Sequence, residues 1–187
     1  MNRTQEHSIR RNLRRCQTGV TLIESAITTS VLATLMSIAA PNFQQMRELR
    51  HLEGAAALLE TDIQQVRSLA VANNRTVRIS FETGAAASCY VVHTGGSGAC
   101  SCIAGGDAVC GAGAEALRTV HYGAGVPLRL QSNSRSIAFD PDKGTVTPTA
   151  TLRVIAQSGA TIHQVVNVMG RVRSCSPAPG LAGYKRC

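Results

Sequence analysis

The sequence contains no tryptophan, and its 187 residues include only three tyrosines and three phenylalanines. Apolar residues nevertheless make up 44% of the chain, so a core must be built from alanine, valine, leucine and isoleucine. The scarcity of aromatic rings also argues against a surface on which unpaired bases stack, the usual device for binding single-stranded nucleic acid. We therefore expect an aliphatic core and no base-stacking platform.

Acidic residues are absent beyond Asp142, whereas six basic residues follow it: Lys143, Arg153, Arg171, Arg173, Lys185 and Arg186. A second basic run lies at the N-terminus, where residues 1–19 hold five arginines and one acid. Residues 20–187 keep 14 basic and 10 acidic side chains, within a net charge of +8 for the whole chain. This asymmetry favours a polyanionic partner for the C-terminal part.

Motifs of catalysis and nucleotide binding are also missing. The sequence has no Gly-x-Ser-x-Gly nucleophile elbow, and the glycine-rich residues 94–114 lack the phosphate-loop pattern. Asp140 and Asp142 flank a proline, which is typical of a turn, and two carboxylates fall short of the roughly six to eight oxygen ligands of calcium. The five histidines are scattered. We predict no enzyme activity, metal or cofactor; an enzyme or metal protein on a membrane stalk is the least favoured alternative.

Seven cysteines are many for this length. Cys16 lies in the basic N-terminal run, and the others form an even set, which favours disulfides in an oxidising compartment. These disulfide candidates are Cys89, Cys100, Cys102, Cys110, Cys175 and Cys187. A zinc site that adds His93 and His121 is the competing interpretation, but the single residue between Cys100 and Cys102 does not fit the usual zinc-ligand spacing. The sequence does not select among the possible pairings.

Residues 20–40 give the strongest signal, an apolar run of 21 residues with one charge, Glu24. About 20 apolar residues span a bilayer as a helix, and the basic stretch before them should stay cytoplasmic. A secretory signal peptide or a plain anchor is the alternative. A signal peptide, however, is cleaved after its apolar run, whereas the better processing mark here precedes it, at Gly19. A carboxylate in an apolar helix costs about 2.5–3.5 kcal/mol at mid-bilayer, so Glu24 needs a reason.

The run G-V-T-L-I-E of residues 19–24, followed by Pro41, resembles the type IV pilin and pseudopilin superfamily. The resemblance implies that a prepilin peptidase cuts between Gly19 and Val20 and that Val20 becomes the methylated N-terminus. It also implies that Glu24 pairs with the N-terminal amine of a neighbouring subunit during assembly. Val20 stands where the family more often has phenylalanine. Pro41 matches the family's helix-kinking proline, and its missing backbone donor predicts a kink.

Beyond Pro41, apolar residues recur at spacings of three and four, which predicts that one helix of about 50 residues continues to Asn73–Asn74. Its apolar stripe comprises Phe43, Met46, Leu49, Leu52, Ala56, Leu59, Ile63, Val66 and Ala70. The polar face carries Arg47, Glu48, Arg50, Glu53, Glu60 and Asp62. We expect the first half of the helix in the membrane and the second half packed on a sheet.

Short alternating or β-branched segments separated by turn residues predict an antiparallel sheet after the helix. They are residues 76–81, 89–93, 117–122, 128–131, 136–140, 145–147, 152–156 and 162–168. Residues 94–114 are expected to form a long surface loop held by disulfides. The predicted fold class is α+β, a pilin-like fold with one long N-terminal helix. Its segments are a leader (1–19), a transmembrane and assembly helix (20–40), an amphipathic continuation (41–74), a sheet domain (75–173) and a C-terminal disulfide loop or tail (174–187).

The downstream order resembles the GspH/FimT branch of pseudopilins and minor pilins, over most of residues 19–173. The matching parts are residues 70–81 directly after the helix, F-D-P-D-K-G at 139–144 and residues 165–173, which end in G-R-V-R. The resemblance implies a low-abundance subunit, often near a filament tip, with other pilins or pseudopilins and a prepilin peptidase as partners. It also implies single-pass insertion in the inner membrane with the C-terminal domain periplasmic. An H-type pseudopilin of a type II secretion system is the alternative; the basic C-terminal stretch favours a pilus.

The G-R-V-R run is the polar cluster with most chemical content. If residues 165–168 form a strand, Arg171 and Arg173 project to one side, and Gly170 lets the backbone turn or approach a ligand. Two guanidiniums on one face can each donate paired hydrogen bonds to phosphate oxygens. In the FimT-like subgroup a Gly-Arg-x-Arg motif is associated with DNA binding in natural transformation; the plain alternative is a solvated strand end. The expected mode is sequence-independent contact with phosphates of duplex DNA.

Lys185 and Arg186 lie just beyond this run and are expected to add to the same DNA-binding surface. A disulfide between Cys175 and Cys187 would draw both toward the strand end. That pairing is a hypothesis.

Overall fold

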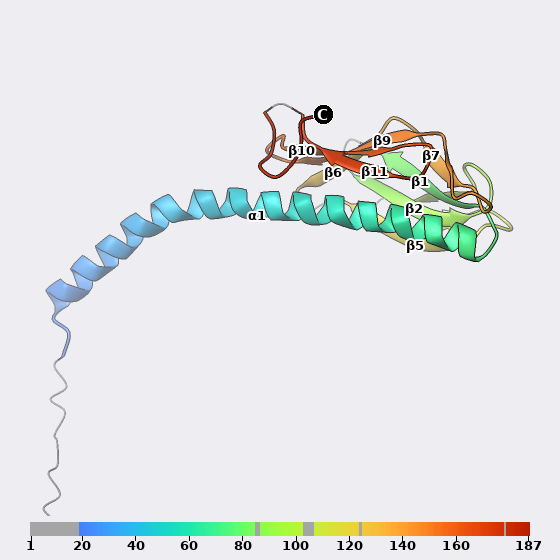
Figure 1. Cartoon of the computed structure of the whole chain (residues 1–187). Helices are drawn as coiled ribbons and strands as arrows, with labels where there is room; N and C mark the ends of the chain where they lie inside the picture. Colours follow the sequence, from blue (N-terminus) through green and yellow to red (C-terminus); the bar gives the residue numbers. More distant parts are fainter. Residues whose placement is uncertain (1–18, 85–86, 103–106, 124, 178) are drawn as a thin grey trace, which may run out of the picture. The chain divides into compact units, whose positions relative to one another are not determined.

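The computed structural model describes residues 19–84, 87–102, 107–123, 125–177 and 179–187, with the side chains of residues 41–42 excepted (Figure 1). The predicted leader, Gly19 apart, lies outside the described residues, and so does Cys16. The chain divides into two compact units, Met1–Asn42 and Phe43–Cys187.

A single helix, α1, covers Leu22–Ala72 and is 51 residues long, as predicted. It begins where the Thr21 hydroxyl accepts a hydrogen bond from the backbone N–H of Glu24 at 3.3 Å, an N-terminal cap. It ends at Ala72, and Asn74 in the turn that follows has a φ of 48°, the left-handed conformation expected at a helix C-terminus. The helix continues through Pro41, and the kink stays a prediction.

In the first unit, α1 is long and apolar enough to cross a membrane. Its large apolar side chains are exposed, as a lipid-facing helix requires. Its serine and threonine hydroxyls donate back to carbonyls of the preceding turn; Thr28, for example, donates to the Glu24 carbonyl at 2.9 Å. These bonds keep the polar side chains satisfied in a segment without buried partners. The N-terminal part of α1 therefore fits a single-pass membrane anchor.

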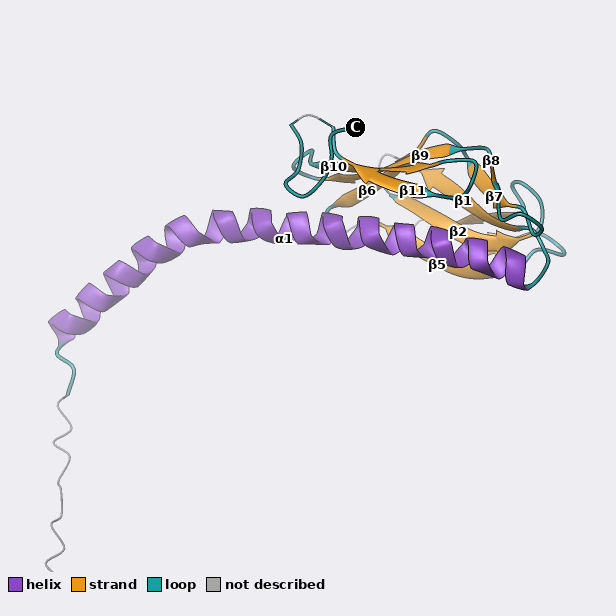
Figure 2. Ribbon diagram, in the orientation of Figure 1, coloured by secondary structure: helices purple, strands orange, loops and turns teal. Residues whose placement is uncertain are grey.

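The second unit contains antiparallel sheets (Figure 2). Its strands are β1 (Val77–Thr83), β2 (Ser88–Thr94), β3 (Cys100–Cys102), β4 (Ala108–Cys110), β5 (Ala116–Tyr122), β6 (Leu128–Ser132), β7 (Ser136–Phe139), β8 (Val146–Thr147), β9 (Ala150–Ala156), β10 (Thr161–Val166) and β11 (Val172–Cys175). The first sheet has the order β5-β2-β1-β7-β8, and the second β11-β10-β9-β6. The predicted α+β class, with one long helix before an antiparallel sheet domain, is confirmed.

The prediction of a long loop over residues 94–114 is wrong in part, because β3 and β4 pair there as a hairpin. Cys100 lies directly opposite Cys110 in that pairing and is joined to it by a disulfide. A second disulfide ties Cys102 to Cys89 on β2. Three-residue strands in a glycine-rich segment carry no alternation that sequence analysis could detect.

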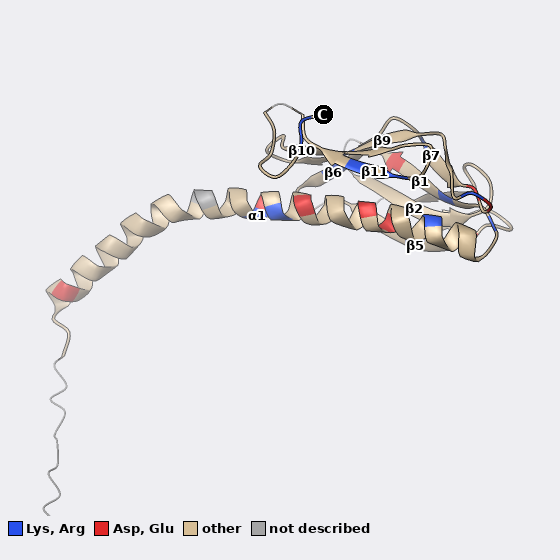
Figure 3. Ribbon diagram, viewed as in Figure 1, with Lys and Arg blue, Asp and Glu red and all other residues tan. Residues whose placement is uncertain are grey.

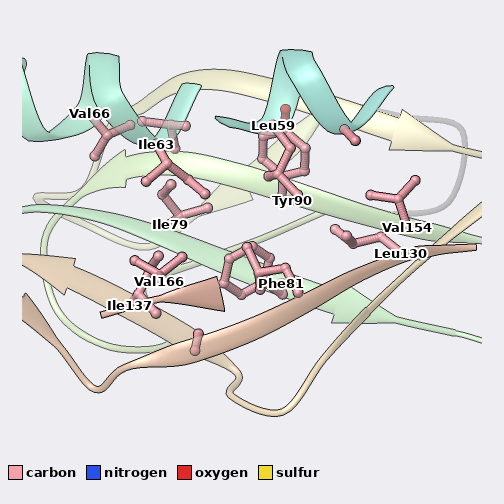
Figure 4. Close-up of a cluster of buried hydrophobic side chains, with 14 of the residues drawn as sticks. Leu59, Ile63, Val66, Ile79, Phe81, Tyr90, Leu130, Ile137, Val154 and Val166 are labelled. Atoms are coloured by element: carbon pink, nitrogen blue, oxygen red, sulfur yellow. The ribbon is translucent and has the colours of Figure 1, made fainter. Parts of the chain in front are cut away.

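The core fills the space between α1 and the inner faces of both large sheets. Figure 4 shows Leu59, Ile63 and Val66 of the helix directed toward strand residues that include Ile79 and Tyr90, all buried. The helical stripe is buried from Leu52 onward, at Leu52, Ala56, Leu59, Ile63, Val66 and Ala70. The first two members of the predicted stripe, Phe43 and Met46, are each 60% exposed, so the core begins later than the pattern suggested.

Asp62 was predicted on the polar face of the helix, but it is only 1% exposed. The Tyr90 hydroxyl donates to its Oδ2 at 2.6 Å, and the Arg118 Nη1 lies 3.1 Å from its Oδ1. A buried carboxylate is tolerated because Oδ2 accepts a hydrogen bond and Oδ1 is in an ion pair, although Oδ1 accepts no hydrogen bond of good geometry from the described residues. Burial and the nearby charges raise the pKa of Tyr90, and burial together with Asp62 raises the pKa of Tyr122 to about 12. This cluster fastens the helix to β2 and β5.

Candidate anion-binding site

The G-R-V-R run begins at a tight turn between β10 and β11. Asn167 Oδ1 accepts hydrogen bonds from the backbone N–H of Met169 at 3.1 Å and of Arg171 at 2.9 Å. Gly170 supplies the positive φ of 71° that the turn requires. The sequence suggested that the G-R-V-R run closes the strand that contains residues 165–168. Instead, the chain reverses direction after that strand, and Val172 begins a separate edge strand.

Arg171 and Arg173 are both exposed, and Arg173 pairs with Val165 across β10. The alternate residue Ser174 faces the helix, where its hydroxyl donates to Glu60 Oε2 at 3.1 Å and to Gln164 Oε1 at 2.9 Å. Alternation therefore directs Arg173 to the opposite, outer side. Arg171, two residues earlier, precedes the strand on the same side.

Gly170 also has a structural explanation. A Cβ at this position would meet Arg67 Cδ at 3.1 Å and the Gly144 carbonyl oxygen at 3.2 Å. Arg67 Nε in turn donates to that carbonyl at 3.1 Å. The glycine therefore allows the β10–β11 turn to approach the helix and the β7–β8 loop closely, a requirement of packing that is independent of any ligand.

The C-terminal residues are held against the end of β11, because a disulfide joins Cys175 to Cys187, as hypothesised. The backbone N–H of Ser176 donates to the Lys185 carbonyl at 2.9 Å, and Ser176 forms an isolated bridge with Arg186. Both basic residues are exposed. The cross-link thus brings the two cations next to the C-terminal end of β11, the strand that contains Arg173.

Two further arginines, Arg129 of β6 and Arg153 of β9, are exposed on the second sheet. Arg153 was counted from the sequence in the basic C-terminal part, but neither arginine was assigned to the candidate site. The signal was present in the alternation L-R-L-Q at 128–131 and T-L-R-V at 151–154, whose leucines are buried. Arg153 lies opposite His163 of β10. Partial burial, followed by the charge of Arg153, lowers the pKa of His163. The outer face of this sheet therefore gathers cationic side chains from β6, β9 and β11.

The remaining predicted residues have structural partners. His93 is buried, with Nε2 2.7 Å from the Ser80 hydroxyl and Nδ1 3.0 Å from the Thr94 carbonyl, so it is a satisfied core histidine. Asp140 Oδ1 accepts hydrogen bonds from the backbone N–H groups of Asp142 and Lys143, so Asp140 and Asp142 belong to a turn. The sulfurs of the six downstream cysteines form three disulfides.

Gly19 and Val20 are exposed immediately before α1, and Glu24 is exposed in its first turn. An acid in the first turn also stabilises the N-terminus of a helix through its dipole, so part of the reason for Glu24 is local. Cleavage, methylation and subunit pairing at these three residues stay predictions.

One protein-family model and two solved structures are similar to this chain. The family model described as "Type II transport protein GspH" matches residues 55–170. Two crystal structures of the type IV minor pilin FimU of Pseudomonas aeruginosa are similar. One has 17% identity and a TM-score of 0.48, over 70% of this chain and 96% of that one; the other has 18% identity and a TM-score of 0.44, over 67% and 97%. No curated protein matches the chain. Because the matched residues cover more than half of the sequence, the chain belongs to the GspH family, within the type IV pilin-like superfamily.

Proposed function

We propose that the chain is a minor type IV pilin of the FimT kind, a structural subunit of pilus assembly that contacts duplex DNA during uptake. A prepilin peptidase removes the leader between Gly19 and Val20, and residues 20–40 then hold the subunit in the inner membrane with the second unit in the periplasm. Glu24 pairs with the methylated amine of Val20 on a neighbouring pilin. Membership of the family and the exposed apolar half of α1 support this part of the proposal.

The observation that carries the DNA contact is the position of Arg171 and Arg173 on the outer side of an edge strand. Both guanidiniums are exposed, and neither is in an ion pair with any residue that the structure describes. Unpaired guanidiniums can each offer two parallel donors to a phosphate. Lys185 and Arg186, which the Cys175–Cys187 disulfide holds nearby, extend the same positively charged surface. Such contacts neutralise phosphates without reading bases.

The DNA contact is tested by titrating the full mature chain, in non-ionic detergent with its disulfides intact, with duplex DNA at several salt concentrations. The Arg171→Ala/Arg173→Ala variant should bind all sequences more weakly, and its log–log salt slope should be smaller by about 0.9 per lost contact. Equal binding by a folded variant would reduce the G-R-V-R run to an ordinary strand end and leave a filament-assembly role.

Assembly is tested separately through Glu24. The Glu24→Gln variant keeps the shape of the side chain but removes the charge that attracts an amine. It should be processed and inserted normally, yet recovered in the membrane fraction and depleted from sheared filaments. Normal incorporation of this variant would contradict the proposed pairing.

The alternative function is an H-type pseudopilin of a type II secretion system, which the description of the matching family favours. The partners then differ: pseudopilins and exported proteins would replace pilins and DNA. Cross-linking of the chain in its native membrane, followed by mass spectrometry of the captured subunits, separates the two. Capture of secretion pseudopilins alone would overturn the pilus assignment.

A further inference from the structure

The outer face of the second sheet has a charge pattern that the G-R-V-R run alone does not explain. Its strands β6, β9, β10 and β11 contain no aspartate or glutamate. The inward residues are apolar apart from Ser132, Gln164 and Ser174, whereas the outward residues include Arg129, Arg153 and Arg173. In Figure 3 acidic residues of this unit are prominent along α1, which packs on the opposite side of this sheet. The acidic and basic side chains that these strands direct outward are therefore all basic.

The strand register brings Arg129 and Arg153 together. Arg129 lies opposite Ile155 on β9, and Arg153 lies opposite Gln131 on β6, so the two arginines are diagonal neighbours. Diagonal neighbours across an antiparallel pair stand about 7–8 Å apart, within reach of long side chains. Two guanidiniums at this spacing can bind one phosphate group from two sides.

A surface hollow of about 370 Å³ lies beside this pair. Its polar lining comprises Arg129, Arg153, Gln131, Asn133, Ser132 and Thr83. At ~30 Å³ for each water molecule, the volume holds about a dozen waters, enough for a phosphate group with part of its sugar. The hollow thus combines two cations with neutral hydrogen-bonding groups at the β6 edge.

No competing acid occupies this site. Among the residues that the structure describes, neither Arg129 nor Arg153 is in an ion pair. The acid nearest in sequence to the lining is Glu82, beside Thr83 on β1. Strand alternation directs Glu82 away from the side shared by Thr83 and the buried Phe81. Two adjacent arginines without a carboxylate repel each other, and an anion between them removes that repulsion.

We propose that Arg129 and Arg153 form a second phosphate-binding subsite, which rests on the proposed DNA contact and enlarges it. The arginines of β6 and β11 are three strand spacings apart, about 14–15 Å. A duplex rises 3.4 Å per nucleotide along each strand, so about four base pairs span that distance. One straight duplex laid across the strands contacts both subsites. His163 of β10 lies between them.

The test uses the full mature chain in non-ionic detergent, with duplex DNA as the probe at several salt concentrations. The Arg129→Gln/Arg153→Gln variant should bind more weakly, with a log–log salt slope smaller by about 1.8 for two lost contacts. The Arg47→Gln/Arg50→Gln variant removes the same charge from the helix and is the matched control. A subsite variant that binds with the affinity and slope of this control overturns the proposal.

A second measurement separates this subsite from the proposed function. Inorganic phosphate is titrated while the arginine Nε–H signals are followed by NMR, and saturable shifts should appear at Arg129 and Arg153. If the Arg171→Ala/Arg173→Ala variant loses DNA while the subsite variant behaves as the control, the subsite fails and the proposed function stands. If wild type binds no DNA but shows the phosphate shifts, DNA uptake fails and an anion subsite stands. Absence of both responses overturns both.

Discussion

Replacing Gly170 by alanine is the sharpest test of the packing around the G-R-V-R turn. Alanine at a φ of 71° occupies the left-handed region, which costs about 1–2 kcal/mol. Its Cβ would also lie 3.1 Å from Arg67 Cδ and 3.2 Å from the Gly144 carbonyl oxygen. Since one of these neighbours is backbone, the turn itself must shift, and overpacking of this kind costs about 1–3 kcal/mol. The two effects together predict a loss of about 2–5 kcal/mol in the free energy of unfolding.

Gly159→Ala is the matched control, because Gly159 has a φ of 89° and no atom within 4 Å of its Cβ position. This variant should lose only the conformational part, about 1–2 kcal/mol. The assay is urea unfolding of the oxidised full chain in non-ionic detergent, followed by circular dichroism. Equal losses in the two variants would refute the close approach of the turn to Arg67 and Gly144.

A double-mutant cycle with Arg67→Ala identifies the neighbour responsible. Removing the Arg67 side chain deletes one of the two close contacts and leaves the Gly144 carbonyl. Gly170→Ala should therefore cost less in this background, with a coupling in the range of about 0.5–3 kcal/mol. Additive losses would mean that the backbone carbonyl alone resists the extra methyl group.

Further predictions concern the buried carboxylate and the C-terminal disulfide. Asp62→Asn removes the charge that, together with burial, raises the pKa of Tyr122 to about 12. Absorbance titration of the tyrosines should show the pKa of Tyr122 falling toward its ordinary value. An unchanged pKa would contradict the electrostatic effect of Asp62 on Tyr122. In the wild type, the raised pKa stabilises the fold below pH 10, and that contribution should disappear as the pH rises from 10 to about 12 in urea-unfolding measurements. Cys175→Ser/Cys187→Ser opens a ring with a sequence separation of 12 and should lower the free energy of unfolding by about 2–3 kcal/mol. The same variant should also bind DNA more weakly, because Lys185 and Arg186 are no longer held beside β11. Stability and DNA binding equal to those of the wild type would show that the disulfide does not hold these residues in place.

Much of the fold could be predicted because its signals are local. The helix length followed from apolar spacing and from Asn74, and most strands followed from alternation. Asp62 could not be placed, because a helical wheel cannot show that Tyr90 and Arg118, distant in sequence, supply partners for a buried carboxylate. Periodicity assigns a polar residue to solvent unless tertiary contacts override it.

The candidate site was predictable only where one segment contains it. Arg171 and Arg173 are two residues apart, so the sequence shows them together. The turn at Asn167, which precedes β11, was not predicted. Arg129 and Arg153 come together only through the register of β6 and β9. The register depends on which faces of the two strands are buried in the core. It is a long-range property that the sequence of either strand alone does not predict.

The two disulfides around the β3–β4 hairpin overlap in sequence, and this has a mechanical consequence. From Cys89 the shortest covalent path crosses to Cys102, runs back to Cys100 and crosses again to Cys110. An extended chain spans at most about 3.5 Å per residue, so the segment between Cys89 and Cys110 would otherwise release roughly 55 Å of additional contour length. Under tension, the oxidised segment between Cys89 and Cys110 stays short even after β3 and β4 separate. It lengthens only when the disulfides are reduced.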